Sequence, residues 1–187
     1  MKKIMFNDRF GLTEAVIEKR KTVTRRMAKE IKIFNPQPPY YVGEVVAVAQ
    51  SYATIAKNHQ DVDYFLEQVG KSLGIDDFDG AGWFGWKNKM VVKADLMPHQ
   101  IRILSVRAER LRDITDEDCL AEGILLKENR VWCNHEEHFI TDYRFPNSKY
   151  VYATAKEAFA TLINKISGKG TWNANPWVWR IEFELIK

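Results

Sequence analysis

A short basic segment, residues 20–26 with the sequence Arg-Lys-Thr-Val-Thr-Arg-Arg, holds the residue types in this chain that are best suited to chemistry. Four of its seven side chains are cations, and they surround two threonine hydroxyls. Most charge runs of this kind are solvated turns. Guanidinium and ammonium groups also bind phosphate and carboxylate, and an amine at Lys21 can activate the hydroxyl of Thr24 as a nucleophile. The residues alone leave these three interpretations open.

Charge is distributed unevenly along the 187 residues. The net charge of +3 is too small to indicate nucleic-acid binding by itself. Residues 18–32, however, hold seven Lys or Arg against two Glu, whereas residues 61–79 hold six Asp or Glu against one Lys. We therefore expect an electrically polarised molecule whose basic side meets an anionic partner.

Composition and length favour one globular domain over residues 1–187. A chain of this size, 45% hydrophobic and 28% charged, can bury a core without disulfides or metals. Its two cysteines, Cys119 and Cys133, do not make a secreted disulfide framework. No apolar run is long enough to span a bilayer, and Asn7 and Asp8 interrupt the N-terminal segment before a signal-peptide core develops. We expect a cytoplasmic protein with no membrane partner.

The elements around the basic segment follow from apolar patterning. Residues 3–6 are expected to form a short strand, and Thr13 is expected to cap a helix over residues 14–19. Beyond a proline-containing loop, residues 44–52 carry a near-continuous run of small and β-branched side chains. Such a run is typical of a strand buried on both faces, as in a closed barrel.

The acidic region that follows is expected to be an excursion from the core. Residues 61–73 place apolar side chains on one helical face. An acidic, glycine-containing loop comes next, and Trp83, Phe84 and Trp86 are expected to pack the excursion down.

The second half of the chain alternates extended and helical patterns. Strands are expected over residues 89–94 and 100–111, and a short helix between its cap Thr115 and Gly123. At the end of that helix, Glu122 can reach a cleft, although spacing alone favours an ordinary surface acid.

The last part of the chain contains its clearest strand pattern. Residues 126–150 are polar and aromatic with no regular pattern, and a capping box at Thr154 begins a helix that ends at Gly168. Along residues 177–186, Trp177 and Trp179 fall on the core-facing side of the alternation. Together the elements predict an α+β protein with a mostly antiparallel sheet that can close into a barrel, because the regular βαβα alternation is missing.

Two further groups of residues resemble a zinc site and a phosphate loop only in part. Cys133, His135 and His138 include zinc-ligand types, but the histidines are three apart and no second ligand cluster accompanies them. Residues 168–171, Gly-Lys-Gly-Thr, lack the upstream glycine and the preceding strand of a phosphate loop. We therefore expect neither a metal nor another cofactor. Trp172 stays open as a surface on which a base can stack.

Several segments, taken in order, resemble the ASCH domain, a member of the PUA-like superfamily of small β-barrels associated with RNA. Residues 21–26, Lys-Thr-Val-Thr-Arg-Arg, resemble the family's Lys-Thr-x-Thr-x-Arg signature, and residues 43–46, Gly-Glu-Val-Val, resemble its Gly-Asp/Glu step into a strand. Residues 114–123 resemble its Leu-Thr-x-x-x-Ala-x-x-Glu-Gly helix, and residues 175–183 are similar to its terminal strand. The resemblance covers the whole chain, with insertions near 55–86 and 126–150.

The resemblance implies a PUA-like, mostly antiparallel β-barrel with flanking helices. It also implies a set of residue roles, because one compact bacterial branch removes the acetyl group from N4-acetylcytidine with a Lys, a Thr and a Glu of these motifs. Carried over to this chain, Lys21 is the proton acceptor, Thr24 the nucleophile and Glu122 the proton donor. An amide needs such a set, because its carbonyl must be attacked and its leaving amine protonated.

Two functions follow from the sequence and the resemblance. The first is binding of RNA or a modified nucleoside in a basic cleft, and the expected ligand contacts are Arg20, Arg25, Arg26, Lys93 and Trp172. The alternative is an amidohydrolase that deacetylates N4-acetylcytidine, or a related acylated base, with Lys21, Thr24 and Glu122. A protein that uses its acidic excursion as an interaction surface is a third, plainer possibility.

Overall fold

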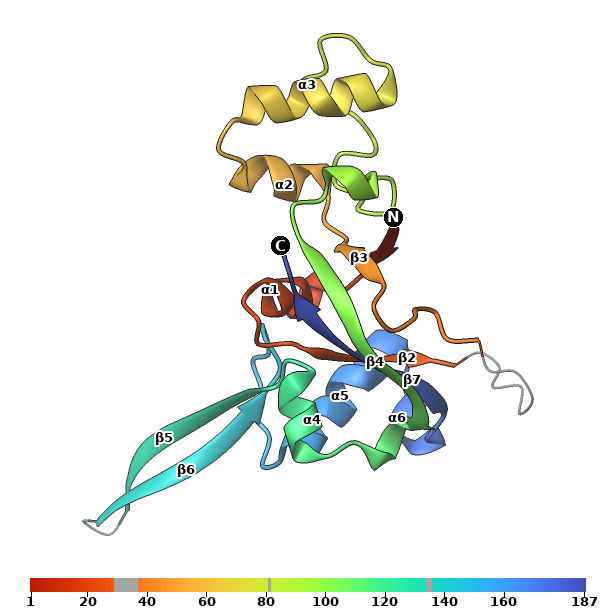
Figure 1. The fold of residues 1–187 in the computed structure, drawn as a ribbon. Helices are drawn as coiled ribbons and strands as arrows, with labels where there is room; N and C mark the ends of the chain where they lie inside the picture. Colours follow the sequence, from red (N-terminus) through yellow and green to blue (C-terminus); the bar gives the residue numbers. More distant parts are fainter. Residues whose placement is uncertain (29–36, 81, 134–135) are drawn as a thin grey trace. The chain divides into compact units, whose positions relative to one another are not determined.

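The computed structural model describes residues 1–28, 37–80, 82–133 and 136–187, without the side chains of residues 131–133, 136 and 139 (Figure 1). The chain is a mixed α+β protein, as its sequence predicts. Its described residues divide into two compact units, which we describe separately. The first unit is Met1–Phe6, Val45–Ile101 and Ile186–Lys187, and the second is Asn7–Glu44 and Arg102–Leu185. That the chain is one domain stays a prediction.

The first unit combines a short parallel strand pair with two helices. Strand β1 (Lys2–Ile4) pairs in parallel with β3 (Val45–Val48). Helices α2 (Tyr52–Asn58) and α3 (Val62–Leu73) follow, and the 3₁₀ helix η2 (Ala94–Leu96) precedes the start of β4 (Gln100–Arg110). Helix α3 was expected from its apolar spacing, and Asp61 caps it by accepting a hydrogen bond from the Tyr64 amide at 2.9 Å.

Tyr52 is the centre of the core of this unit. Its side chain is fully buried, and its ring lies 5.6 Å from the ring of Trp83, 6.2 Å from that of Trp86 and 6.3 Å from that of Phe65. Trp83 and Trp86 thus pack the acidic excursion as predicted. Phe84 does not, because its side chain is 87% exposed.

Two predicted strands of this unit are wrong in part or in full. The strand expected over residues 44–52 ends at Val48, because Ser51 caps α2 with its hydroxyl, which accepts from the Thr54 amide at 3.2 Å. Residues 89–94 form no strand: residues 89–91 lie in a turn and residue 94 begins η2. Their carbonyl groups at Met90 and Val92 accept hydrogen bonds from the Lys3 ammonium at 2.7 and 2.8 Å.

The second unit holds the remaining elements. Its sheet has the order β4-β7-β2, and β2 (Val23–Met27) runs antiparallel to β7 (Trp177–Leu185). The other elements are the 3₁₀ helices η1 (Asp8–Phe10) and η3 (Leu111–Asp113), the helices α1 (Leu12–Ile17), α4 (Asp116–Ala121), α5 (Ala155–Ser167) and α6 (Thr171–Ala174), and the strands β5 (Leu125–Cys133) and β6 (Glu136–Arg144). Among the described residues no closed barrel is found.

Helix boundaries in the second unit test the capping predictions. Thr115 caps α4 and Thr154 caps α5, each through a hydroxyl that accepts from a backbone amide three residues on. The helix predicted over residues 14–19 is present as α1, but its predicted cap, Thr13, is wrong. This helix begins at Leu12, after Gly11 in a left-handed conformation, and the Thr13 hydroxyl instead donates to the Asp8 carboxylate.

Residues 126–150, expected to be irregular, contain a β-hairpin. Strands β5 and β6 pair antiparallel over their whole length, from Leu125 opposite Arg144 to Cys133 opposite Glu136. Its polar and apolar residues do not alternate strictly, because most of the described side chains along the hairpin are exposed. Without a buried face to impose a period of two, the sequence carries little signal for a strand.

The last strand lies where the alternation predicts it, but the predicted burial of one of its two tryptophans is wrong. Trp179 is buried with 8% exposure, whereas Trp177 is 42% exposed, so its assignment to the core is wrong. Trp177 is the first residue of β7, where the strand has just emerged from the loop after α6. No helix in the part of the chain that the structure describes is long and apolar enough to cross a membrane.

Helix α4 provides a test of this fold. Replacing Thr115 by Ala removes the hydroxyl that caps the helix, so we expect the free energy of unfolding to fall by about 1 kcal/mol. Urea unfolding followed by circular dichroism measures the change. Thr141→Ala, at an exposed position of β6, is the matched control and should change stability by less than about 0.5 kcal/mol. Equal effects of the two substitutions would contradict the cap.

Candidate functional site

The segment between α1 and β2 packs against the end of α4. The Lys21 amide donates to the Ala15 carbonyl at 2.9 Å, and the Thr22 amide donates to the Ala121 carbonyl at 2.9 Å. Gly123, which follows the helix, has a φ of 99°, a left-handed conformation that favours glycine. These backbone contacts bring Lys21 and Glu122 together within the second unit.

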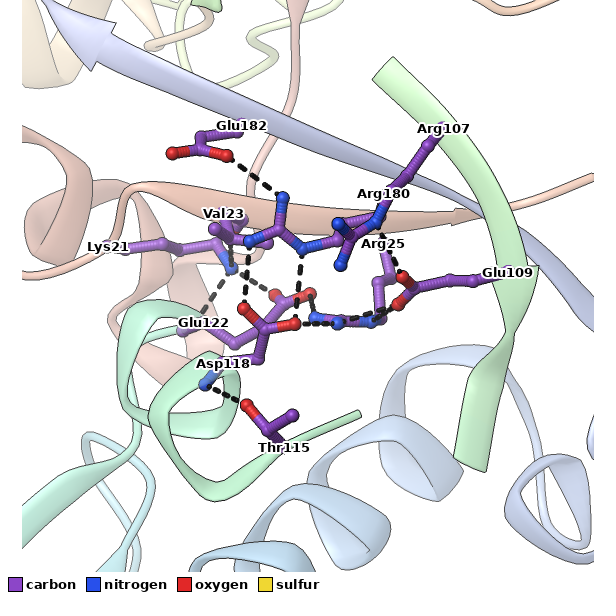
Figure 2. Close-up of polar contacts among 10 residues, drawn as sticks. All are labelled: Lys21, Val23, Arg25, Arg107, Glu109, Thr115, Asp118, Glu122, Arg180 and Glu182. Carbon is purple, nitrogen blue, oxygen red and sulfur yellow. Dashed lines mark hydrogen bonds and ion pairs between the residues drawn. The ribbon is translucent and has the colours of Figure 1, made fainter. Parts of the chain in front are cut away.

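Lys21 and Glu122 form a buried ion pair, although 101 residues separate them in the sequence. The Lys21 ammonium also donates to the backbone carbonyls of Val23 and Glu122, each at 2.8 Å (Figure 2). The two residues are 2% and 5% exposed. Burial lowers the pKa of Lys21, and the Glu122 carboxylate partly opposes that shift.

Arg25 of β2 points into a group of carboxylates. Its guanidinium donates to Glu109 at 2.8 Å and to Glu122 at 3.3 Å, and it forms an ion pair with Asp118 (Figure 2). Burial alone would lower the pKa of Arg25, but the three carboxylates outweigh it and the pKa is raised. The N–H donors of Arg25 are therefore bonded to carboxylates inside the protein.

Asp118 lies between two arginines of neighbouring strands. The register of β2 and β7 places Arg25 directly opposite Arg180, an arrangement that is unfavourable for two like charges. Asp118 bonds to both guanidiniums, with Arg180 donating to its carboxylate at 2.8 and 3.1 Å. Glu182 accepts from Arg180 at 3.0 Å. Helix α4 thus supplies the carboxylate that allows the two arginines to face each other.

Thr24, the predicted nucleophile, is 5% exposed and pairs with Ile181 across the β2–β7 ladder. Successive side chains of a strand point to opposite faces. Thr24 is therefore directed away from the face of β2 on which Arg25 meets its carboxylates. The structure brings Lys21 and Glu122 into contact and places Thr24 next in sequence to Val23, whose carbonyl binds Lys21.

The predicted ligand-binding residues have different surroundings. Arg20 is exposed and donates to Glu18 at 2.7 Å. Arg26 is half-buried, and burial lowers its pKa. Lys93 belongs to the other unit, where its ammonium donates to the Ser72 carbonyl. With Arg25 in the interior, the basic segment exposes less cationic surface than its sequence indicates.

Trp172, a predicted ligand contact, belongs to a group of arginines and tryptophans in the second unit whose other members sequence reasoning missed. The Arg110 guanidinium lies 4.6 Å from the centre of the Trp177 ring, and that of Arg112 lies 6.0 Å from the centre of the Trp172 ring. Asn175 holds the two arginines, because its carbonyl accepts from the Arg110 side chain at 3.2 Å and its side-chain oxygen accepts from the Arg112 amide at 2.8 Å. We call these five residues the Arg–Trp surface.

The exposure of the Arg–Trp surface distinguishes it from the buried ion pairs. Both arginines are exposed, Trp177 is exposed and Trp172 is half-buried. One signal was present in the sequence: Asn175-Pro176 directly before the last strand marks a turn, after which the first strand residue need not be core. Asn175 has a φ of 45°.

Among the residues that the structure describes, no group of three or more His, Cys, Asp or Glu side chains is placed to hold a metal ion. His135 and the side chain of Cys133 lie outside the described part, so the arrangement weighed for Cys133, His135 and His138 is not addressed. Cys119 is a buried free thiol, and burial raises its pKa to about 12.

Comparison of the chain with models of known protein families, with curated proteins and with solved structures gives no match.

The position of Asp118 predicts a pH dependence. Bonds from Arg180, helped by Arg25, lower the pKa of Asp118 from 3.8 to about 2. Because the folded pKa is the lower one, the stabilisation is complete above the ordinary pKa and is lost as the pH falls toward 2. We expect the stability difference between wild type and Asp118→Asn to shrink by about 2 kcal/mol between about pH 5 and about pH 2.

Urea unfolding of both proteins at the two pH values measures this difference. Asp142→Asn provides the control, because Asp142 accepts a hydrogen bond from Asn129 in the hairpin and meets no arginine of the buried group. A difference between wild type and Asp118→Asn that does not vary with pH would contradict the bridging role of Asp118.

Proposed function

We propose that this chain is a PUA-like ASCH protein that binds RNA or a modified nucleoside, and that the Arg–Trp surface contacts the ligand. The motif resemblance over the whole chain supports the family and the class of ligand. The single observation that carries the choice of surface is the pairing of two exposed arginines with two tryptophan rings.

The chemistry of this surface suits an unpaired nucleotide. Bases stack on aromatic rings and on guanidinium planes, and such stacking tolerates any base because every base has a π-face. Arginine donors also bind phosphate oxygens with matched geometry. Arg110, the last residue of β4, and Arg112, in η3, flank Leu111, whose side chain is fully buried and holds the backbone that carries both arginines.

The basic segment has a different part in this proposal. Arg25 is enclosed by three carboxylates and Arg20 is paired with Glu18. Transferring Arg25 to phosphate would take away one of the cations that neutralise three buried or partly buried carboxylates, which is unfavourable. We assign Arg25 to holding β2, β4 and α4 together, and assign phosphate contacts to the arginines of the Arg–Trp surface.

Binding of a fluorescent single-stranded RNA oligonucleotide, followed by anisotropy, tests the proposal. Trp177→Ala should weaken binding roughly 5- to 150-fold, because one stacked base is worth about 1–3 kcal/mol. Arg112→Ala should reduce the salt dependence of the affinity by about one phosphate contact. Phe84→Ala is the matched control, since Phe84 is an exposed aromatic residue of the other unit.

Absence of RNA binding at low salt would contradict RNA as the ligand. Binding that Trp177→Ala and Phe84→Ala change equally would contradict the surface but leave the ligand standing. The two parts of the proposal are therefore tested separately.

A second candidate function is hydrolysis of an acylated cytosine such as N4-acetylcytidine. The contact between Lys21 and Glu122 favours it, because these are the residues that the resemblance names as proton acceptor and proton donor.

This reaction needs the Thr24 hydroxyl to reach Lys21, although the alternation of β2 directs Thr24 away from the face that holds Arg25. The ion pair first transfers a proton from Lys21 to Glu122, so that Lys21 can accept the hydroxyl proton and Glu122 can protonate the leaving amine. The Thr24 oxygen then attacks the acyl carbon and Lys21 takes the hydroxyl proton. Water then releases the acyl group from Thr24. Burial lowers the pKa of Lys21, which is the direction that a general base requires.

Release of cytidine from N4-acetylcytidine, followed by chromatography, tests this candidate. Thr24→Val removes the hydroxyl with little change of shape and should abolish activity, with a loss of about 100-fold or more. Thr22→Val is the matched control, because Thr22 is the exposed threonine of the same segment. An active wild type with equally active Thr24→Val would contradict the role of Thr24. An inactive wild type would remove the candidate.

A further inference from the structure

The β5–β6 hairpin is a two-stranded sheet, and no third strand pairs with it along its length in the described residues (Figure 1). Two-stranded hairpins are marginally stable in water by themselves. In this one, Leu126 is 49% exposed and Ile140 is 50% exposed. The pairing register puts them on opposite faces, because Leu126 faces Tyr143 and Ile140 faces Asn129. Both faces of the hairpin thus expose an aliphatic side chain.

The two edges of the hairpin differ. At the base of β6, Tyr143 exchanges two backbone hydrogen bonds with Tyr152, at 2.8 and 3.0 Å, so this edge is partly covered. Strand β5 runs nine residues from Leu125 to Cys133 and contains neither proline nor glycine. Every second residue of an edge strand presents an unpaired N–H and C=O, which makes a long, unbroken edge a template for another strand.

The charges of β5 select a second copy of β5 as the strand that fits this edge. In an antiparallel pair of identical strands, a two-fold axis through Asn129 places Glu128 of each copy opposite Arg130 of the other. Opposite charges at such positions stabilise the pair. The same register places Leu126 opposite position 132, which is Trp132.

The neighbouring registers are unfavourable. Residues that face each other in an antiparallel pair must both present their hydrogen-bonding groups to the partner or both turn them away. The two-fold axis can therefore pass only through a residue and not between two residues. The nearest alternatives to Asn129 are its two neighbours. An axis through Glu128 places two glutamates opposite each other, and an axis through Arg130 places two arginines opposite each other. Like charges directly opposite are destabilising, so the axis through Asn129 is preferred.

We propose that two copies of this chain associate through β5, in antiparallel pairing about Asn129, to form a four-stranded sheet of the order β6-β5-β5-β6. The pairing covers the β5 edge of both copies at once. It closes with two-fold symmetry, so it stops at a dimer. The proposal is independent of the ligand and of any reaction.

Charge exchange tests both the dimer and its register. Sedimentation equilibrium of the full chain over a concentration series should show a dimer. Glu128→Arg and Arg130→Glu should each raise the dissociation constant about tenfold or more, because each variant faces itself with like charges. An equimolar mixture of the two variants should recover the dimer, because the two arginines of one variant strand then meet the two glutamates of the other.

Glu14→Arg is the matched control, since it makes the same charge change at an exposed position of α1 and should leave the dimer unchanged. Arg130 also pairs with Glu137 in its own hairpin, so circular dichroism of each variant checks that the hairpin persists. A monomeric wild type would overturn the proposal and leave the edge for a strand of another protein. A dimer that neither variant weakens would overturn the β5 interface.

A cysteine placed on the axis gives a second measurement. Asn129→Cys should form a disulfide-linked dimer under mild oxidation, because residues facing each other in an antiparallel pair have β-carbons about 4.5–5.5 Å apart. The wild-type chain and Thr141→Cys, on β6, are the controls and should cross-link far less. Equal cross-linking of Asn129→Cys and Thr141→Cys would overturn the register.

Discussion

The contact on which the second unit depends is the bridge that Asp118 makes between Arg25 and Arg180. The antiparallel pairing of β2 and β7 places these two arginines opposite each other, and only an anion between them makes that pairing favourable. Asp118 arrives from α4, so the register of the sheet and the position of a helix depend on one carboxylate. Glu109 of β4 and Glu122 at the end of α4 complete the neutralisation of Arg25. The buried charges of this unit therefore form one connected group.

This connected group changes the meaning of the basic segment. A run of cations in a sequence gives no information on where the compensating anions lie, and here they come from residues 109–122, far along the chain. With these anions taken into account, most of the basic segment is buried and paired inside the protein, and Arg20 is exposed at its edge. The proposed function assigns ligand binding to arginines that have aromatic partners instead of acidic ones. For these exposed side chains, desolvation costs little and a ligand can compete for the donors.

Short sequence patterns correctly predicted the features that depend on neighbouring residues alone. The caps at Thr115 and Thr154 were correct, because a cap is decided within four residues. The contact of Lys21 with Glu122 was anticipated only through the family resemblance, since no local pattern links positions 101 residues apart. The missed features share one cause. The turns after Lys89 depend on a side chain from β1, the hairpin lacks a buried face, and the exposure of Trp177 depends on how the preceding loop turns.

The backbone bond from Lys21 to Glu122 also bears on how the protein folds. Glu122 is the residue that ends α4, and its carbonyl is one of the groups that a helix leaves without an internal partner. The Lys21 ammonium satisfies this carbonyl and places a positive charge at the negative end of the helix dipole. A helix of six residues is too short to persist alone in water. Its last turn is completed by a residue that is synthesised 101 positions earlier, so α4 becomes stable when it docks, and secondary and tertiary structure form together at this point of the chain.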